Sequence, residues 1–166
     1  MLVSKKTGFT LVEFILYTGI LAICLAGIVS FMYLSLNTRV RADVSSTVES
    51  EGLIILSTIN QTIRNSQTIT TPTAQNTAAS IVLTGTTNNT FDLSGDQIRT
   101  TTGATPAVAL NSGKVTASAL SFTNTSLSGT TGSVKYSFTL TYNNPGGSIP
   151  FTYSRTFRGA ATLRRN

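Results

Sequence analysis

Two hydrophobic patterns follow one another in the first part of the chain. From Phe14 to Leu36 the sequence runs for 23 residues without a formal charge, and most of these side chains are large and apolar. A helix of that length rises about 35 Å, which is enough to cross a hydrocarbon core about 30 Å thick. The first pattern therefore predicts a membrane-spanning helix.

The second pattern is an amphipathic stripe beyond Arg39. Its apolar members recur mostly at every fourth position, with Leu56 beside them: Val40, Val44, Val48, Ile55, Ile59 and Ile63. Charges of both signs surround the stripe, and no proline occurs before Pro72. We expect one continuous helix from about Thr10 to about Asn65, roughly 85 Å long, whose second half rests on a folded domain. Because the polar face mixes both charges, we prefer this interpretation to a membrane-surface helix.

The rest of the chain has the pattern of short strands. The stretch Thr68–Ala78 is predicted to be a Thr-rich connector. Four strand-like segments follow, the second and third joined by a turn at Ser94-Gly95-Asp96: Ser80–Thr84, Thr90–Leu93, Gln97–Thr101 and Lys114–Asn124.

The clearest strand pair comes last. Apolar and polar residues alternate over Ser133–Tyr142 and again over Ile149–Phe157, with the loop Asn143–Ser148 between them. This predicts an antiparallel hairpin with one aromatic face, and that face should cover the helix stripe at Val48, Ile55 and Ile59. The fold class is therefore α+β: one long helix, half transmembrane and half amphipathic, packed in a lollipop arrangement on a small antiparallel sheet.

The amino-acid composition limits the kinds of catalytic and metal sites that the chain can form. The net charge is +6, yet charged residues make up only 11% of the chain, and histidine is absent. The single cysteine, Cys24, lies in the apolar segment, so no intramolecular disulfide or His/Cys metal site can form. Apart from Glu13 there are five carboxylates, and no two are spaced as a catalytic pair. We expect a protein that is not an enzyme and needs no cofactor.

The apolar segment has two simple interpretations, a secretory signal peptide or a signal anchor. Its length exceeds the usual signal core of about 7 to 15 residues, and no small-x-small cleavage site follows it. An uncleaved anchor fits better, with Lys5 and Lys6 holding the N-terminus in the cytoplasm and the rest of the chain outside. Glu13 sets it apart from an ordinary anchor, because a charge at bilayer depth costs about 2.5 to 3.5 kcal/mol unless a partner offsets it.

The residues Lys5-Lys6-Thr7-Gly8-Phe9-Thr10-Leu11-Val12-Glu13 closely resemble the processing site of type IV prepilins and type II secretion pseudopilins. The resemblance covers about the first thirty residues. It implies that a prepilin peptidase cuts between Gly8 and Phe9 and that Phe9 is then N-methylated. It also implies that Glu13 pairs with the new amino terminus of a neighbouring subunit.

The resemblance and the hydrophobic patterns together divide the chain into a leader (1–8), a membrane and filament-core helix (9–36), an amphipathic half-helix (37–66) and an extracellular β-rich head (67–166). Major pilins usually carry a proline in the helix, and this chain has Ser30 about there, which favours a minor subunit. The Thr-rich strand and Arg-Asn ending resemble minor pilins of the J or W type. The implied partners are the prepilin peptidase and methyltransferase, other pilin subunits, the inner-membrane assembly platform and the membrane.

The protein is accordingly expected in the cytoplasmic membrane with its head outside, and later in an extracellular filament. Two other functions remain open. One is a type II secretion pseudopilin, and the other is an unprocessed membrane-anchored adhesin or binding module.

Two weaker candidate sites lie in the head. Arg155, Arg158, Arg164 and Arg165 could contact DNA phosphates or an anionic surface, although we favour a solvated strand face and chain end. Asp92 and Asp96 flank a turn and are conceivable Ca²⁺ ligands. Two carboxylates are few for an ion that takes about six to eight oxygens, so ordinary turn residues are the preferred interpretation.

Overall fold

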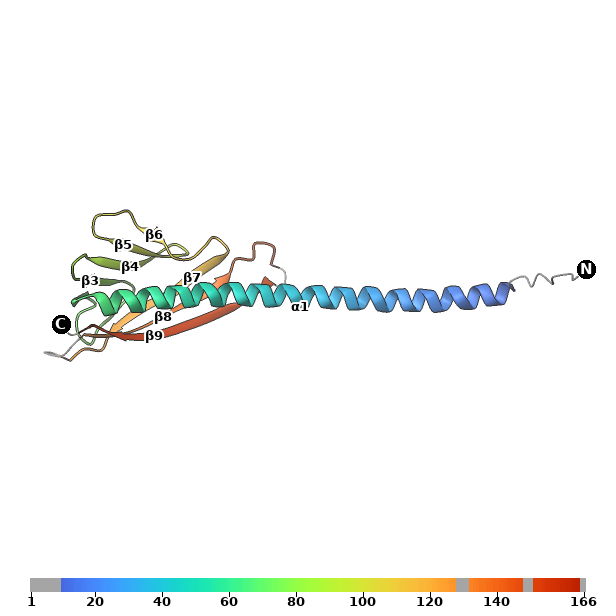
Figure 1. The fold of residues 1–166 in the computed structure, drawn as a ribbon, viewed down its shortest axis with the longest axis horizontal. Helices are drawn as coiled ribbons and strands as arrows, with labels where there is room; N and C mark the ends of the chain where they lie inside the picture. The colour runs from blue at the N-terminus through green and yellow to red at the C-terminus, as the bar shows by residue number, and fades with distance from the viewer. Residues whose placement is uncertain (1–9, 128–131, 148–150, 165–166) are drawn as a thin grey trace, which may run out of the picture. The chain divides into compact units, whose positions relative to one another are not determined.

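The computed structural model describes residues 10–127, 132–147 and 151–164 (Figure 1). The predicted leader with its cleavage site at Gly8 and Phe9 lies outside these residues, as do Ile149, Pro150 and Arg165. The chain forms two compact units, residues 1–40 and residues 41–166. The helix α1, Leu11–Asn65, contributes to both units, and its ends agree with the predicted ones to within one residue.

In the first unit, α1 satisfies its own polar groups. The backbone N–H of Glu13 donates to the hydroxyl of Thr10 at 3.3 Å, so Thr10 caps the helix. The hydroxyls of Thr18, Ser30 and Thr38 donate to the carbonyls four residues earlier, at 2.9, 2.8 and 3.0 Å. A hydroxyl bonded in this way needs no partner from outside the helix, which suits an apolar surrounding.

In the second unit, α1 buries one face. The buried positions are spaced by four residues except for one step of three: Val44, Val48, Gly52, Ile55, Ile59 and Ile63. This spacing follows the turns of a helix, so the side chains form one stripe. The predicted amphipathic half is therefore confirmed, with Leu56 half-buried beside the stripe.

Two antiparallel sheets, instead of the single sheet expected, form the rest of the second unit. The first has the order β1-β3-β4-β5-β6, and its strands are β1 Thr68–Thr71, β3 Ile81–Thr84, β4 Asn89–Ser94, β5 Gln97–Thr102 and β6 Val108–Ala109. The second has the order β2-β7-β8-β9, and its strands are β2 Thr77–Ala78, β7 Val115–Asn124, β8 Ser133–Tyr142 and β9 Ser154–Thr162. The α+β class is confirmed.

Two further sequence predictions need correction. The stretch expected to be a connector contains β1 and β2, because each finds a partner, β3 and β7 respectively, that lies far from it in the sequence. The last strand begins at Ser154 and continues to Thr162, later than predicted. Phe151 lies before it and is 38% exposed, so this side chain is not on the buried face.

The second sheet covers the helix stripe with its aromatic face, as predicted. Phe138 pairs with Phe157 across β8 and β9, and their rings stack with centroids 5.4 Å apart. The Phe157 ring lies against Gly52 of α1. The hydroxyl of Tyr136 donates to the carbonyl of Leu56 at 3.1 Å. Because side chains alternate along a strand, this packing turns Lys135 and Arg158 to the outer face of the sheet.

Candidate functional site

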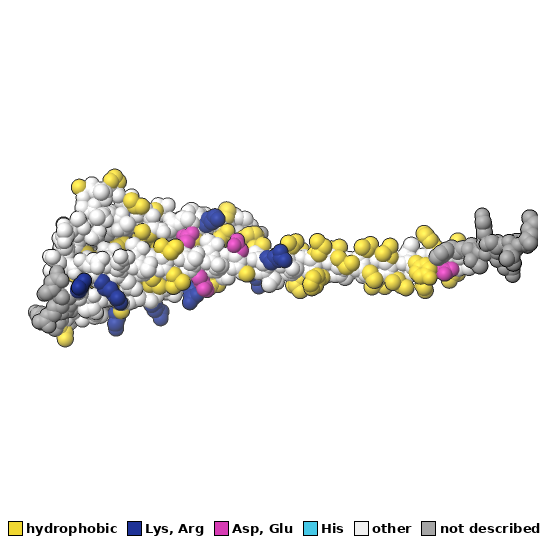
Figure 2. All heavy atoms as spheres, in the orientation of Figure 1, with side chains coloured by type: hydrophobic (Ala, Val, Ile, Leu, Met, Phe, Trp, Pro, Cys, Tyr) yellow, Lys and Arg dark blue, Asp and Glu magenta, His cyan; other side chains and the backbone are white. Residues whose placement is uncertain are grey.

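The apolar half of α1 has no cover within the chain. Every large apolar side chain from Leu11 to Leu36 is more than half exposed, from 51% at Tyr17 to 76% at Leu11. Figure 2 shows these yellow side chains around the helix. Among the described residues, α1 is the one helix long and apolar enough to cross a membrane. Such a surface is stable only against lipid or other apolar side chains.

Glu13 is the one carboxylate in this apolar half, and it lies in the first turn of the helix. A negative charge there interacts favourably with the unpaired N–H groups and the helix dipole. Thr10 and Glu13 also have the spacing of a capping box, a local role that the sequence reasoning missed. A second contact comes from the Tyr17 hydroxyl, 3.5 Å from Glu13 Oε1.

The described arginines near the end of the chain, Arg155, Arg158 and Arg164, lie in different settings. Arg155 forms an ion pair with Glu49 of α1 at 2.5 Å, and Tyr153 donates to the same carboxylate at 3.1 Å. Arg155 thus ties the start of β9 to the helix. Arg158 and Arg164 are exposed and form no ion pair with a described residue.

Two further cations lie beside Arg158 and Arg164. Arg64 is in the last turn of α1, next to Arg164, whose backbone N–H donates to the Arg64 carbonyl at 3.2 Å. Lys135 is on β8, where it pairs with Ala160, two residues along β9 from Arg158. We call Arg64, Lys135, Arg158 and Arg164 the basic surface. The sequence analysis named Arg158 and Arg164 but had no signal for Arg64 and Lys135, because the strand register decides which cations are neighbours.

Tyr136 lies beneath the basic surface. Burial raises the pKa of this phenol to about 12, an effect that the nearby Arg64 partly offsets. A raised pKa keeps the phenol neutral at physiological pH. Tyr136 therefore adds no negative charge beside the four cations.

The carboxylates considered for Ca²⁺ lie in different settings. Asp92 on β4 forms an ion pair with Arg99, its cross-strand partner on β5. Asp96 is exposed in the turn between these strands. No group of three or more His, Cys, Asp or Glu side chains suited to a metal ion occurs in residues 10–127, 132–147 or 151–164. Asp92 thus has a cross-strand arginine partner, and Asp96 lies in the turn.

No protein-family model, no curated protein and no solved structure matches this chain. The resemblance to prepilins therefore rests on Lys5 to Glu13 and on the helix that follows.

Proposed function

We propose that this chain is a structural subunit, of the minor kind, of a type IV pilus or related filament. A prepilin peptidase cuts it after Gly8, and the subunit is assembled through the apolar half of α1. The observation that carries the proposal is an uncovered apolar helix that begins with a single carboxylate, Glu13, directly after a prepilin-like processing motif.

The exposed apolar side chains support this proposal because they need two successive environments. Before assembly, lipid surrounds Leu11 to Leu36 and removes the cost of exposing them to water. In a filament, the same side chains pack against the helices of neighbouring subunits. The chain can leave the membrane because one apolar environment replaces another, and the free-energy difference stays small.

Glu13 gives the assembly its direction and register. Cleavage after Gly8 creates a positively charged amine at Phe9, and an amine from one subunit can pair with the Glu13 carboxylate of the next. In an apolar surrounding such a pair is much stronger than in water. It offsets the cost of about 2.5 to 3.5 kcal/mol of holding the lone carboxylate at bilayer depth.

The capping box offers a competing reason for Glu13, and one substitution separates the two. In Glu13→Gln the side chain can still reach back to cap the helix, since Gln serves at this position as Glu does, but the charge is lost. We expect Glu13→Gln to be processed normally and to fall at least about tenfold in sheared filaments from cells with the protein's own assembly machinery. That loss corresponds to about 1.4 kcal/mol of pairing free energy.

The matched control is Asp43→Asn, which removes a carboxylate from α1 outside the apolar half. It should enter filaments to within about twofold of the unmodified protein, since a surface charge contributes little. Normal incorporation of Glu13→Gln would leave capping as the role of Glu13 and remove the proposed pairing.

A further inference from the structure

The second sheet ends in a long edge strand, β9, which pairs with β8 on one side and is outermost in the sheet order (Figure 1). It has nine residues without a proline, and its register with β8 shows no bulge. The other three edge strands are shorter: β2 and β6 have two residues each, and β1 has four and a shifted register. Short or bulged edges resist pairing with another chain. Among the described strands, β9 is thus the edge best suited to such pairing.

The backbone groups on the outer side of β9 have no partner among the described residues. On the inner side, the N–H of Leu163 donates to the Gly132 carbonyl at 2.8 Å, and the carbonyl of Tyr153 accepts from Tyr142 at 2.9 Å. Because bonding direction alternates along an antiparallel strand, the odd-numbered residues of β9 face β8. The even-numbered residues direct their N–H and C=O groups outward, and all are exposed: Ser154, Thr156, Arg158, Ala160 and Thr162.

The side chains beside this edge favour a partner with carboxylates. Arg158 and Lys135 lie on the outer face of the sheet, and Lys135 pairs with Ala160. Since Ala160 is small, a long side chain opposite it on an added strand can reach over its methyl group to Lys135. A hollow of about 440 Å³, whose lining includes Lys135, Arg158, Gly159 and Ala160, gives that side chain room. Glutamates opposite Arg158 and Ala160 would meet both cations.

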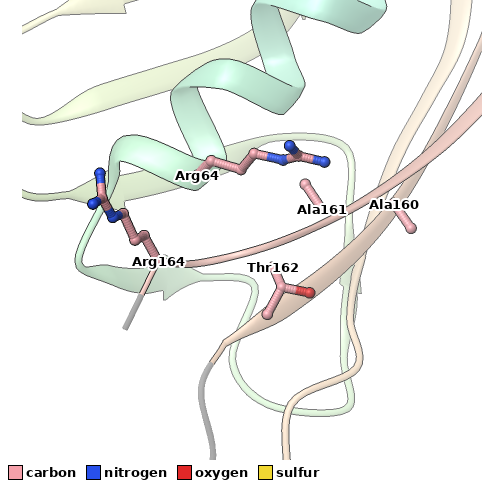
Figure 3. A pocket seen from close by; sticks show the side chains of 5 residues that line it. All are labelled: Arg64, Ala160, Ala161, Thr162 and Arg164. Atoms are coloured by element: carbon pink, nitrogen blue, oxygen red, sulfur yellow. The ribbon is translucent and has the colours of Figure 1, made fainter. Parts of the chain in front are cut away.

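A second hollow lies toward the end of the same edge. It has a volume of about 410 Å³ and is lined by Arg64, Ala160, Ala161, Thr162 and Arg164. Figure 3 shows this hollow, with the side chain of Arg64 reaching over Ala161. The small side chains let another backbone approach the strand, and arginine is well suited to hold a carboxylate. This end of the edge therefore has the same preference for an acidic partner.

Arg158 disfavours a second copy of the chain as the added strand. Two β9 strands paired about a twofold axis would bring two basic surfaces together, and like charges on neighbouring strands destabilise the pairing. The nearest carboxylate on this strand's partners does not offset that repulsion, since Glu49 is already paired with Arg155. A charge that discourages self-pairing and attracts an acidic strand gives the edge specificity.

We propose that the free edge of β9 binds an extended acidic segment of another protein, which adds an antiparallel strand to the second sheet. Backbone hydrogen bonds supply the affinity, and carboxylates opposite Arg158 and Ala160 supply the specificity. The antiparallel direction follows the rest of this sheet, in which every pair of strands is antiparallel. This inference goes beyond the proposed function and depends neither on processing nor on assembly into filaments.

The test is binding of a fluorescent nine-residue peptide, in which valine and glutamate alternate, to the full chain in a neutral detergent, measured by anisotropy. The peptide matches β9 in length and should bind saturably. In the proposed arrangement its glutamate amides face β9 and its valine amides face away. N-methylation of the glutamate amides should therefore weaken binding at least about tenfold, whereas N-methylation of the valine amides should change it less than about threefold.

Two pairs of variants locate the bound peptide. Ala160→Pro removes an N–H that faces away from the sheet and should weaken binding at least about tenfold, whereas Ala160→Ser keeps this N–H and should stay within about twofold. Arg158→Glu should weaken binding about fivefold. Its control is Lys114→Glu, the same charge change at an exposed position outside the basic surface, which should have less than about a twofold effect. Circular dichroism checks the fold of each variant.

Four results would overturn the proposal. Absence of peptide binding is the first, and equal binding of the two N-methylated peptides, which would show that charge alone holds the peptide, is the second. The third is equal weakening by Arg158→Glu and Lys114→Glu. The fourth is self-association of the chain, measured by light scattering, that Ala160→Pro abolishes, because a second copy would then occupy the edge. The N-methylated peptides decide between strand addition and charge even if a variant fails to fold.

Discussion

Asn111 is a buried side chain that joins the two sheets of the head. Its amide oxygen accepts from the N–H of Ile98 on β5 at 2.9 Å, and its amide nitrogen donates to the carbonyls of Asp96 and Val115 at 3.1 and 2.7 Å. A second bond between the sheets runs from the N–H of Ala117 to the Asp96 carbonyl at 2.8 Å. Polar groups buried in this way are costly when they lose their partners.

Replacing Asn111 by Ala should therefore lower the free energy of unfolding by about 3 kcal/mol, because the Ile98 N–H and the Val115 carbonyl lose partners in a buried place, while the Asp96 carbonyl keeps its bond from Ala117. Urea unfolding of the detergent-solubilised chain, followed by circular dichroism, measures this. The matched control is Asn143→Ala, since Asn143 is exposed and donates one bond to the Gly113 carbonyl. Asn143→Ala should lower the free energy of unfolding by less than about 1 kcal/mol. Similar losses in the two variants would contradict the role given to Asn111.

At the scale of elements, the contact between α1 and β9 depends on a glycine. A Cβ atom at Gly52 would lie 2.1 Å from the nearest ring carbon of Phe157. The absence of a side chain at Gly52 lets the ring pack directly on the helix. Gly52 thus has a packing role, although glycine lowers helix propensity by about 1 kcal/mol relative to alanine.

The variant Gly52→Ala tests this packing. The added methyl should force the Phe157 ring or the strand to move and lower the free energy of unfolding by about 1 to 3 kcal/mol, despite the better helix propensity of alanine. Gly113→Ala is the control, because no atom lies within 4 Å of its Cβ position. If Gly52→Ala were as stable as the unmodified chain in the same urea titration, the close approach would have no energetic importance.

The sequence predicted those elements whose pattern repeats locally. The period of the α1 stripe and the alternation along β8 indicated the helix and its covering strand, because burial on one face imposes that period. The residues Ser94-Gly95-Asp96 also predicted a turn. In the structure Gly95 lies in the turn between β4 and β5 with a positive φ of 58°. Glycine adopts this conformation without steric cost.

Features that depend on pairing between distant segments could not be predicted. β2 has two residues and β1 has four, too few to show alternation, and each exists because a distant strand pairs with it. The basic surface is similar, since Lys135 and Arg158 become neighbours only through the register of β8 and β9. The ion pair between Arg155 and Glu49 could not be predicted either, because the two residues lie 106 positions apart in the sequence.

At the scale of the whole molecule, the two units present different surfaces. Residues 10–40 are a bare apolar helix, and residues 41–166 form a packed core with a mostly uncharged polar surface. A chain of this kind needs a membrane or neighbouring subunits around its first unit, whereas the second can face water. The proposed processing acts on the first unit, where it frees an amine just before the apolar helix.

The mature N-terminus shows whether the chain is processed as a prepilin. The measurement is the intact mass of the full chain from membranes of cells that also produce an active prepilin peptidase, with Gly8→Leu as the control, because a side chain at this position should block an extended fit in a narrow protease site. The account predicts a chain that has lost its first eight residues and begins at Phe9 with one added methyl group, while Gly8→Leu stays uncut. An unprocessed chain in the presence of that peptidase would contradict the account and leave a plain membrane anchor.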